Sequence, residues 1–173
     1  MIYHLKVILF DRRESEVEIE VDRRQTFLDL HLALQKAFVF PPCQMASFFS
    51  TDYHGRKKFE ISEVEMGTKN PPCHPMRRTR VGDIISQKSP FIYYTFDFFN
   101  DRSLILELTG INMEKNLKEP KVKINGTDQQ VQVLQEIIAD DYIAAMDKLQ
   151  TSSDYGVADD YYEIFGDIEE FTI

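Results

Sequence analysis

Apolar and polar residues alternate along the first part of the chain and predict two strands. Residues 3–10 place an apolar side chain at every second position, and EVEIEVD at residues 16–22 alternates without exception. Side chains of a strand point alternately to opposite faces, so both segments have one apolar face. The intervening DRRES predicts a turn and hence a hairpin. Four acidic residues are expected to face water: Glu16, Glu18, Glu20 and Asp22.

Residues 26–38, TFLDLHLALQKAF, contain the clearest helical pattern. Five apolar residues recur at steps of three and four and define one face: Phe27, Leu30, Leu34, Ala37 and Phe38. Thr26 suits the N-cap position, and Asp29 three residues later completes a capping-box pattern. Leu28 and Leu32 widen the apolar face, so we expect a well-buried helix. The prolines at 41 and 42 prevent its continuation.

Further strand patterns follow this helix. We predict strands over these segments: 45–51, 58–65, 91–98, 104–108 and 121–124. Residues 91–98 are apolar on both faces apart from Thr95 and Asp97, which is typical of a central strand covered on both sides. Residues 67–78 include three prolines and predict an irregular loop. Thr79 is the expected cap of a short helical turn that follows.

The character of the chain changes after residue 127. Apolar residues at helical spacing predict a helix over residues 128–150: Val131, Leu134, Ile138, Tyr142, Ala145 and Leu149. Residues 151–173 mix acidic and aromatic side chains without a sustained period and predict a tail. We therefore expect a domain over residues 1–127, then this helix packing on or beside it, then the tail. The fold class is α+β, a largely antiparallel and strongly curved sheet packed on one main helix.

The net charge of −9 is concentrated at one end of the chain. Residues 1–120 contain 17 basic and 17 acidic residues, whereas residues 121–173 contain 3 and 12, and 3 − 12 = −9. This distribution argues against a general nucleic-acid surface, which requires concentrated positive charge. An acidic segment instead suits a basic protein partner, or shields a basic face of its own domain.

Several polar residues are candidates for binding. Arg77, Arg78 and Arg80 form a short basic cluster, which is either a phosphate or nucleic-acid contact or an uncommitted surface. His31 lies at the edge of the helix face, where its simplest role is a packed side chain with a hydrogen bond. Asp97 shares a strand face with Thr95 and is either a buried carboxylate or the cap of a turn.

Soft metal ligands and nucleophiles are few. Cys43, Cys73, His54 and His74 have irregular spacing, so neither a zinc site nor a Cys–His catalytic pair is expected. The sequence has no phosphate-binding glycine loop and no HExxH motif. We therefore expect no cofactor, no metal and no catalytic residue. No segment reaches the roughly 20 apolar residues of a membrane span, and two cysteines favour a reducing compartment, so we expect a cytoplasmic protein.

Together these elements resemble the plasmid pRiA4b ORF-3-like family over about residues 1–110. The residues that carry the resemblance are Tyr3 and Leu5, then Phe27, Leu30 and His31, then Phe48, then Phe96, Asp97 and Phe98. The resemblance implies an α+β fold and no established reaction. This sequence departs from the family pattern at four positions of the last motif: Phe99, Asn100, Arg102 and Leu104. It therefore resembles a divergent member, of a kind associated with Bacteroidetes-like bacteria, that keeps the scaffold and replaces a polar site.

Three hypotheses about function follow. The first is a non-enzymatic, cytoplasmic, protein-binding domain whose contact element is the acidic C-terminal region, with Tyr161, Tyr162 and Phe165 as its candidate aromatic contacts. The second is an accessory factor of a mobile element that contacts nucleic acid through the arginine cluster. The third is an enzyme or small-ligand binder around His31 and Asp97. Exposed strand edges are compatible with a monomer or a homodimer.

Overall fold

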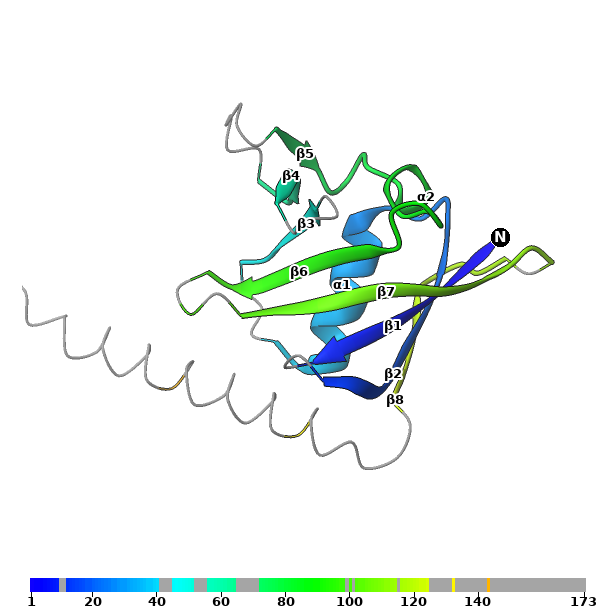
Figure 1. Cartoon of the computed structure of the whole chain (residues 1–173), viewed down its shortest axis with the longest axis horizontal. Helices are drawn as coiled ribbons and strands as arrows, with labels where there is room; N and C mark the ends of the chain where they lie inside the picture. The colour runs from blue at the N-terminus through cyan, green and yellow to red at the C-terminus, as the bar shows by residue number, and fades with distance from the viewer. Residues whose placement is uncertain are drawn as a thin grey trace, which may run out of the picture. The chain divides into compact units, whose positions relative to one another are not determined.

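The fold is built on one curved sheet of eight strands, seen in a computed structural model (Figure 1). The structure describes residues 1–9, 12–40, 45–51, 56–64, 72–98, 100, 102–114, 116–124, 132 and 143. Alpha-carbon contacts divide the chain into two units, Met1–Gln135 and Glu136–Ile173. Only the first is described in detail, so the predicted helix over 128–150, apart from residues 132 and 143, and the predicted tail lie outside the described residues. The predicted domain boundaries stay a prediction.

The strands follow the predicted patterns closely. In chain order the elements are β1 (Ile2–Leu9), β2 (Arg12–Asp22), α1 (Phe27–Phe38), β3 (Ser47–Thr51), β4 (Lys57–Ser62), β5 (Cys73–Pro75), α2 (Val81–Ile84), β6 (Phe91–Asp97), β7 (Arg102–Asn112) and β8 (Lys121–Ile124). Their order across the sheet is β5-β4-β3-β6-β7-β1-β2-β8, and neighbours are antiparallel except β4 and β5. The predicted α+β class and its largely antiparallel sheet are confirmed.

The curvature of the sheet has a local cause. The register shifts within the β1–β2, β1–β7, β3–β4 and β6–β7 pairs. An extra residue on one strand bends that strand and increases its twist. The shifts in the last three pairs each insert one residue, and such bulges bend the sheet around α1, which lies behind β6, β7 and β1 in Figure 1.

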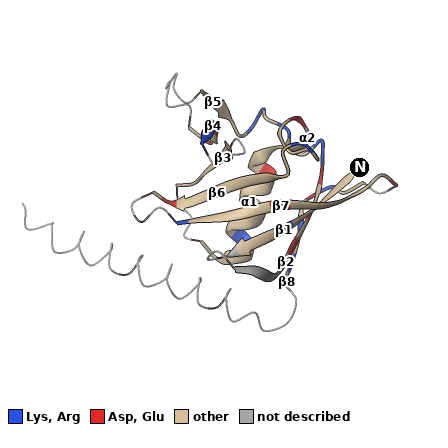
Figure 2. Ribbon diagram, in the orientation of Figure 1, with Lys and Arg blue, Asp and Glu red and all other residues tan. Residues whose placement is uncertain are grey.

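Helix α1 begins and ends as the sequence predicts. The Thr26 side chain accepts a hydrogen bond from the Asp29 amide, and the Asp29 carboxylate accepts one from the Thr26 amide. Asp29 in the first turn and Lys36 in the last complement the helix dipole, and Figure 2 shows these opposite charges at the two ends. The prediction that Leu32 is buried is wrong, because Leu32 is 53% exposed.

The core lies between α1 and the sheet and is rich in aromatic side chains. Phe27 of α1 meets Phe48 of β3 with ring centroids 4.9 Å apart, and Phe48 meets Tyr94 of β6 at 4.8 Å. Leu5 and Ile19 of the first hairpin are also fully buried. Edge-to-face and tilted ring contacts of this kind add to the stabilisation from buried area.

Four sequence predictions are corrected. Asp22 does not face water, since it is 1% exposed and paired with Arg24. Residues 73–75 form β5 within the predicted irregular loop, because they pair with β4. Arg80, not Thr79, is the N-cap of α2, and the Thr79 hydroxyl donates to the carbonyl of Pro75 instead. Strand β6 is central but not covered on both faces along its length, since Phe91 is 43% exposed.

Candidate functional site

The loop between β2 and α1 is fixed by a buried carboxylate. Asp22 ends β2, where its Oδ1 accepts hydrogen bonds at 3.0 Å from both the amide and the Nε of Arg24. Its Oδ2 accepts a bond from Arg24 Nη2 at 3.2 Å. These bonds to the Arg24 side chain hold the pKa of Asp22 down, at about 2, although burial opposes the shift. Charge-assisted hydrogen bonds of this geometry fix the orientation of the Arg24 side chain on the short loop between β2 and α1.

Helix α2 docks against the same loop through backbone hydrogen bonds. The amide of Gly82 donates to the carbonyl of Arg23, and the amide of Val81 donates to that of Gln25, both at 2.9 Å. A Cβ at position 82 would lie 2.8 Å from the Cβ of Arg23 and 2.9 Å from its carbonyl oxygen. Glycine is therefore required for this close approach, which brings Arg23 next to α2.

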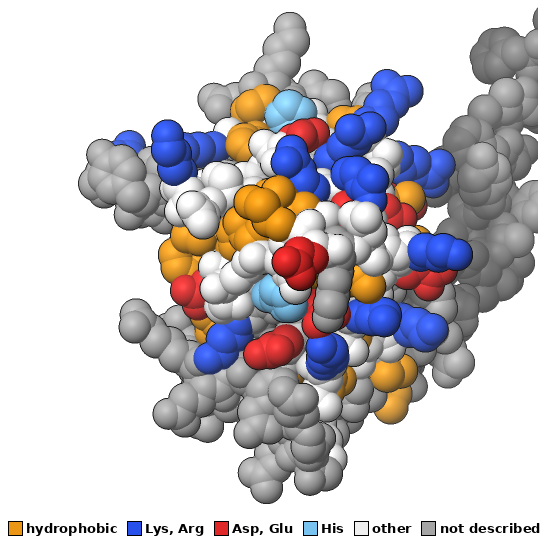
Figure 3. Space-filling model, turned by 90° about the vertical axis from the view of Figure 1, so that its right-hand side faces the viewer, with side chains coloured by type: hydrophobic (Ala, Val, Ile, Leu, Met, Phe, Trp, Pro, Cys, Tyr) orange, Lys and Arg blue, Asp and Glu red, His pale blue; other side chains and the backbone are white. Residues whose placement is uncertain are grey.

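These contacts create a pocket with a volume of about 410 Å³. It is lined by Met1, Arg23, Arg24, Arg80, Asp83 and Asn116. The lining has three arginines against one carboxylate, and the amide oxygen of Asn116 accepts a bond from Arg24 at 3.2 Å. Figure 3 views the molecule from the side of the N-terminus and shows Lys and Arg side chains gathered over the upper part of this face.

The predicted arginine cluster is divided between two environments. Arg80 lines the pocket. Arg77 is exposed and pairs with Glu63 at 3.7 Å, and Arg78 is exposed on the turn before α2. Arg23 and Arg24 were not predicted to line a pocket. Their position between a strand and a helix was visible, but the proximity of α2 was not, because it depends on tertiary backbone bonds.

His31 is a buried core residue. It is 3% exposed, and its Nδ1 lies 3.0 Å from the hydroxyl of the fully buried Tyr94. Burial lowers the pKa of His31, despite a small opposing effect of Glu63, and raises the pKa of Tyr94. A neutral His31 therefore shares one hydrogen bond with Tyr94 inside the helix–sheet core.

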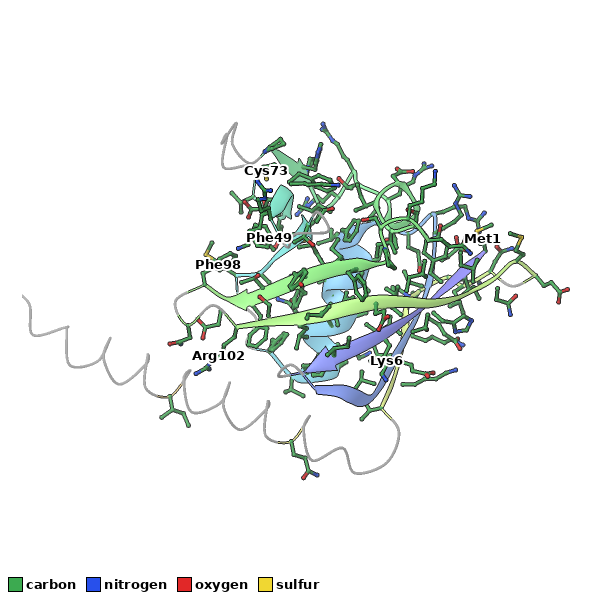
Figure 4. The ribbon with its side chains drawn as sticks, viewed as in Figure 1. Met1, Lys6, Phe49, Cys73, Phe98 and Arg102 are labelled. Carbon is green, nitrogen blue, oxygen red and sulfur yellow. The ribbon has the colours of Figure 1, made fainter. Side chains whose placement is uncertain are left out.

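Asp97 lies at the end of β6 and stabilises the turn to β7. Its Oδ1 accepts a bond from the Asn100 amide at 3.0 Å, and its Oδ2 accepts one from the Asn100 side chain at 2.7 Å. Arg102 pairs with the same carboxylate at 3.6 Å. Figure 4 shows Phe98 and Arg102 at this end of the hairpin, opposite Met1. His31 and Asp97 thus have different environments, one in the core and one on a turn.

The neighbouring candidates for a metal site or a catalytic pair, Cys73 and His74, also lie in different environments. Cys73 Sγ lies 3.0 Å from the Ser62 hydroxyl, whereas the ring of His74 packs against Phe59. Within the described ranges, no group of three His, Cys, Asp or Glu side chains is arranged to hold a metal ion. Cys43, His54, Tyr161, Tyr162 and Phe165 lie outside the described residues. The helices of the described part include none long and apolar enough to cross a membrane.

The α+β fold and the buried helix motif define the class to which this chain belongs. A family model described as "Plasmid pRiA4b ORF-3-like protein" matches residues 1–136. The chain belongs to this family, which confirms the resemblance seen in the sequence. A search of the curated proteins finds no match.

One similar solved structure is the crystal structure of the protein of unknown function MM3350 from Methanosarcina mazei Go1. It is 19% identical in sequence, with a TM-score of 0.57, and the similarity covers 96% of this chain and 90% of that one. At this level of identity the likeness concerns the fold alone.

The residues that carry the family motif have structural roles here. Tyr3, Leu5, Phe27, Leu30 and Phe48 are all buried at 5% exposure or less. At the divergent positions of the last motif, the replacing residues make contacts within the hairpin: Asn100 and Arg102 bind Asp97, and Leu104 is 1% exposed. Most residues of the motif therefore specify the core in this chain, while Asp97 and Phe98 lie at the β6–β7 turn.

Proposed function

We propose that this protein is a non-enzymatic domain of the cytoplasm that acts by binding another protein. Its acidic C-terminal region, residues 121–173, supplies the contact. The observation that supports this most is the charge distribution: residues 1–120 are balanced and residues 121–173 carry the whole net charge of −9. A segment with this excess attracts a basic surface and accelerates association with it.

The environments of the candidate residues support a binding role over catalysis. His31 makes its hydrogen bond inside the core, and Asp97 makes its bonds within a turn. General acid–base catalysis needs a titratable group within reach of a substrate. His31 is buried and does not meet that requirement, and the Asp97 carboxylate is engaged by Asn100 and Arg102.

The partner in this proposal has a basic surface with an apolar groove. Tyr161, Tyr162 and Phe165 lie among the acidic residues of the segment 151–173. Aromatic side chains at the centre of an interface supply most of its binding energy, and charges at its rim set association rate and specificity. A partner that is only basic would bind through charge alone and would dissociate at moderate salt.

The test is a quantitative pull-down from the native cell with the full chain and with a chain that lacks residues 151–173. The proposal predicts a partner that is recovered by the full chain and lost with the segment. A matched variant replaces Tyr161, Tyr162 and Phe165 with Ser and keeps every charge, and we expect it to lose most of the recovery. If the partner is recovered equally well without residues 151–173, this segment does not make the contact and the proposal is wrong.

A second candidate function is contact with nucleic acid by an accessory factor of a mobile element. It is favoured by the basic side chains gathered on one face (Figure 3) and by the family description. The test is a gel shift with duplex DNA at low salt, using the full chain and a variant with Arg77, Arg78 and Arg80 replaced by Gln. Salt-sensitive binding that the variant loses would support it, and no binding at low salt would end it.

A further inference from the structure

We propose that the pocket between the β2–α1 loop and α2 binds a small phosphorylated molecule, such as a sugar phosphate. The pocket is the one lined by three arginines, with Asp83 and Asn116 as its other polar side chains. The inference is independent of the protein-binding function proposed above, because it involves the described domain alone.

The positive charge of the pocket exceeds what its own contacts neutralise. Arg24 is committed to the carboxylate of Asp22 and to the amide oxygen of Asn116. Arg23 and Arg80 have no ion-pair partner among the residues that the structure describes, and both are exposed. Two guanidinium groups, each with five N–H donors in a planar fork, are therefore available to an anion.

The backbone segments that carry the two available arginines are held together before any ligand arrives. Backbone bonds from Val81 and Gly82 to Gln25 and Arg23 join the two segments that carry them. An antiparallel bridge between Thr26 and Arg80 adds a further link. Donors on backbone segments that are already joined bind more tightly than donors on free loops, because only the side chains lose conformational freedom on binding.

The shape and the remaining polar groups select the class of ligand. A volume of about 410 Å³ is that of a small-molecule site. Arginine forks match the oxygen atoms of a phosphate. The carboxylate of Asp83 offers acceptors for hydroxyl groups beside that phosphate, and the side-chain NH2 of Asn116 offers donors, since its oxygen already accepts bonds from Met1 and Arg24. Asp83 also repels a continuous polyanion, so a phosphate attached to a polyol fits better than a nucleic-acid backbone.

The test is calorimetric titration of the full chain with ribose 5-phosphate, at an ionic strength held constant with NaCl. Ribose and inorganic phosphate serve as partial ligands. We expect binding of ribose 5-phosphate that is tighter than binding of inorganic phosphate, and no heat with ribose. No binding of ribose 5-phosphate, or binding no tighter than that of inorganic phosphate, would overturn the proposal.

Matched variants identify the site. Replacing Arg23 and Arg80 together with Gln is expected to weaken ribose 5-phosphate binding at least about tenfold, because each removes a charge-assisted hydrogen bond. The control replaces Arg77 and Arg78, which lie outside the pocket lining, and is expected to bind like the wild type. Equal weakening in both variants would indicate a nonspecific charge effect and contradict the site.

Two further measurements complete the test. Thermal unfolding of each variant shows whether it is folded, and both are expected to melt near the wild-type temperature, because all four arginines are exposed. Gly82→Ala provides an independent variant, since its Cβ would displace Arg23. We expect it to weaken binding as well. A duplex oligonucleotide that binds more tightly than ribose 5-phosphate through Arg23 and Arg80 would replace the proposal with a nucleic-acid surface.

Discussion

The buried pair of His31 and Tyr94 makes the stability of the domain sensitive to pH. Burial lowers the pKa of His31 from its ordinary value of 6.5 in the folded state. Below that pH the unfolded chain binds a proton that the folded chain does not, so folding becomes less favourable as the pH falls. The stabilisation is complete above the unfolded pKa and is lost between the unfolded and the folded pKa.

We predict that the free energy of unfolding falls between about pH 7.5 and about pH 5.5, and that His31→Gln reduces this fall. Denaturant unfolding at both pH values measures it. His74→Gln is the control, since His74 is exposed, and it should keep the wild-type pH dependence. If His31→Gln and the wild type lose equal stability over this range, His31 does not titrate as described.

Val39 has a left-handed backbone conformation after α1. Its φ is 56°, and its side chain is 70% exposed. Its backbone N–H caps the helix by donating a hydrogen bond to the carbonyl of Gln35. A β-branched residue is strained in this region, whereas glycine adopts it freely.

We predict that Val39→Gly raises the free energy of unfolding by about 0.5–1 kcal/mol, since the relief of strain exceeds the entropy cost of glycine. Chemical denaturation measures the change. Ala33→Gly, within the same helix, provides the contrast and should destabilise by about 1 kcal/mol. A loss of stability in Val39→Gly would contradict the account of strain at this position.

Single residues were predictable where local chemistry dominates. The packed His31 and the capping box of Thr26 and Asp29 follow from spacing alone, and the structure contains both. Asp22 was predicted to face water because it continues an alternating acidic face. It is buried instead, because Arg24 two residues later folds back onto its carboxylate, which is a contact that strand alternation does not encode.

At the scale of elements, the acidic face of β2 is neutralised by its neighbours. Glu18 lies opposite Lys6 of β1 and Lys123 of β8, and Lys123 donates a hydrogen bond to Glu20. This bond is the largest cause of the lowered pKa of Glu20. The stripe of carboxylates is thus part of the pairing that holds the edge strand β8.

The turn between β6 and β7 depends on Asp97. We predict that Asp97→Ala lowers the free energy of unfolding by about 1–2 kcal/mol, since it removes two hydrogen bonds and an ion pair. Thermal or chemical unfolding measures the loss. Gln87→Ala, on an exposed turn, should change stability by less than about 0.5 kcal/mol. Equal effects of the two substitutions would mean that Asp97 does not stabilise the turn.

The longer elements were predictable from their periodicity. The segments with strict alternation form β1, β2 and β7, and the segment with the helical pattern forms α1. Strand β5 was not predictable, because three residues with two prolines nearby have no periodicity of their own. They become a strand only through parallel pairing with β4.

At the scale of the whole molecule, the described domain is electrically mixed. Three of its arginines line one pocket, while the excess of acid is confined to residues 121–173. Arg80 was predictable as a candidate but Arg23 and Arg24 were not, because the pocket joins segments that are more than 50 residues apart (80 − 24 = 56). The charge distribution, in contrast, was readable from the sequence because it requires no knowledge of the fold.

The measurement that tests the central claim most directly is recovery of a protein partner by the full chain with every Asp and Glu of residues 151–173 changed to the corresponding amide. This variant keeps the aromatic residues and the length of the segment. The account predicts that it loses the partner that the wild type recovers, and that recovery by the wild type falls as salt is raised. Recovery equal to that of the wild type at every salt concentration would contradict the claim that the acidic region makes the contact.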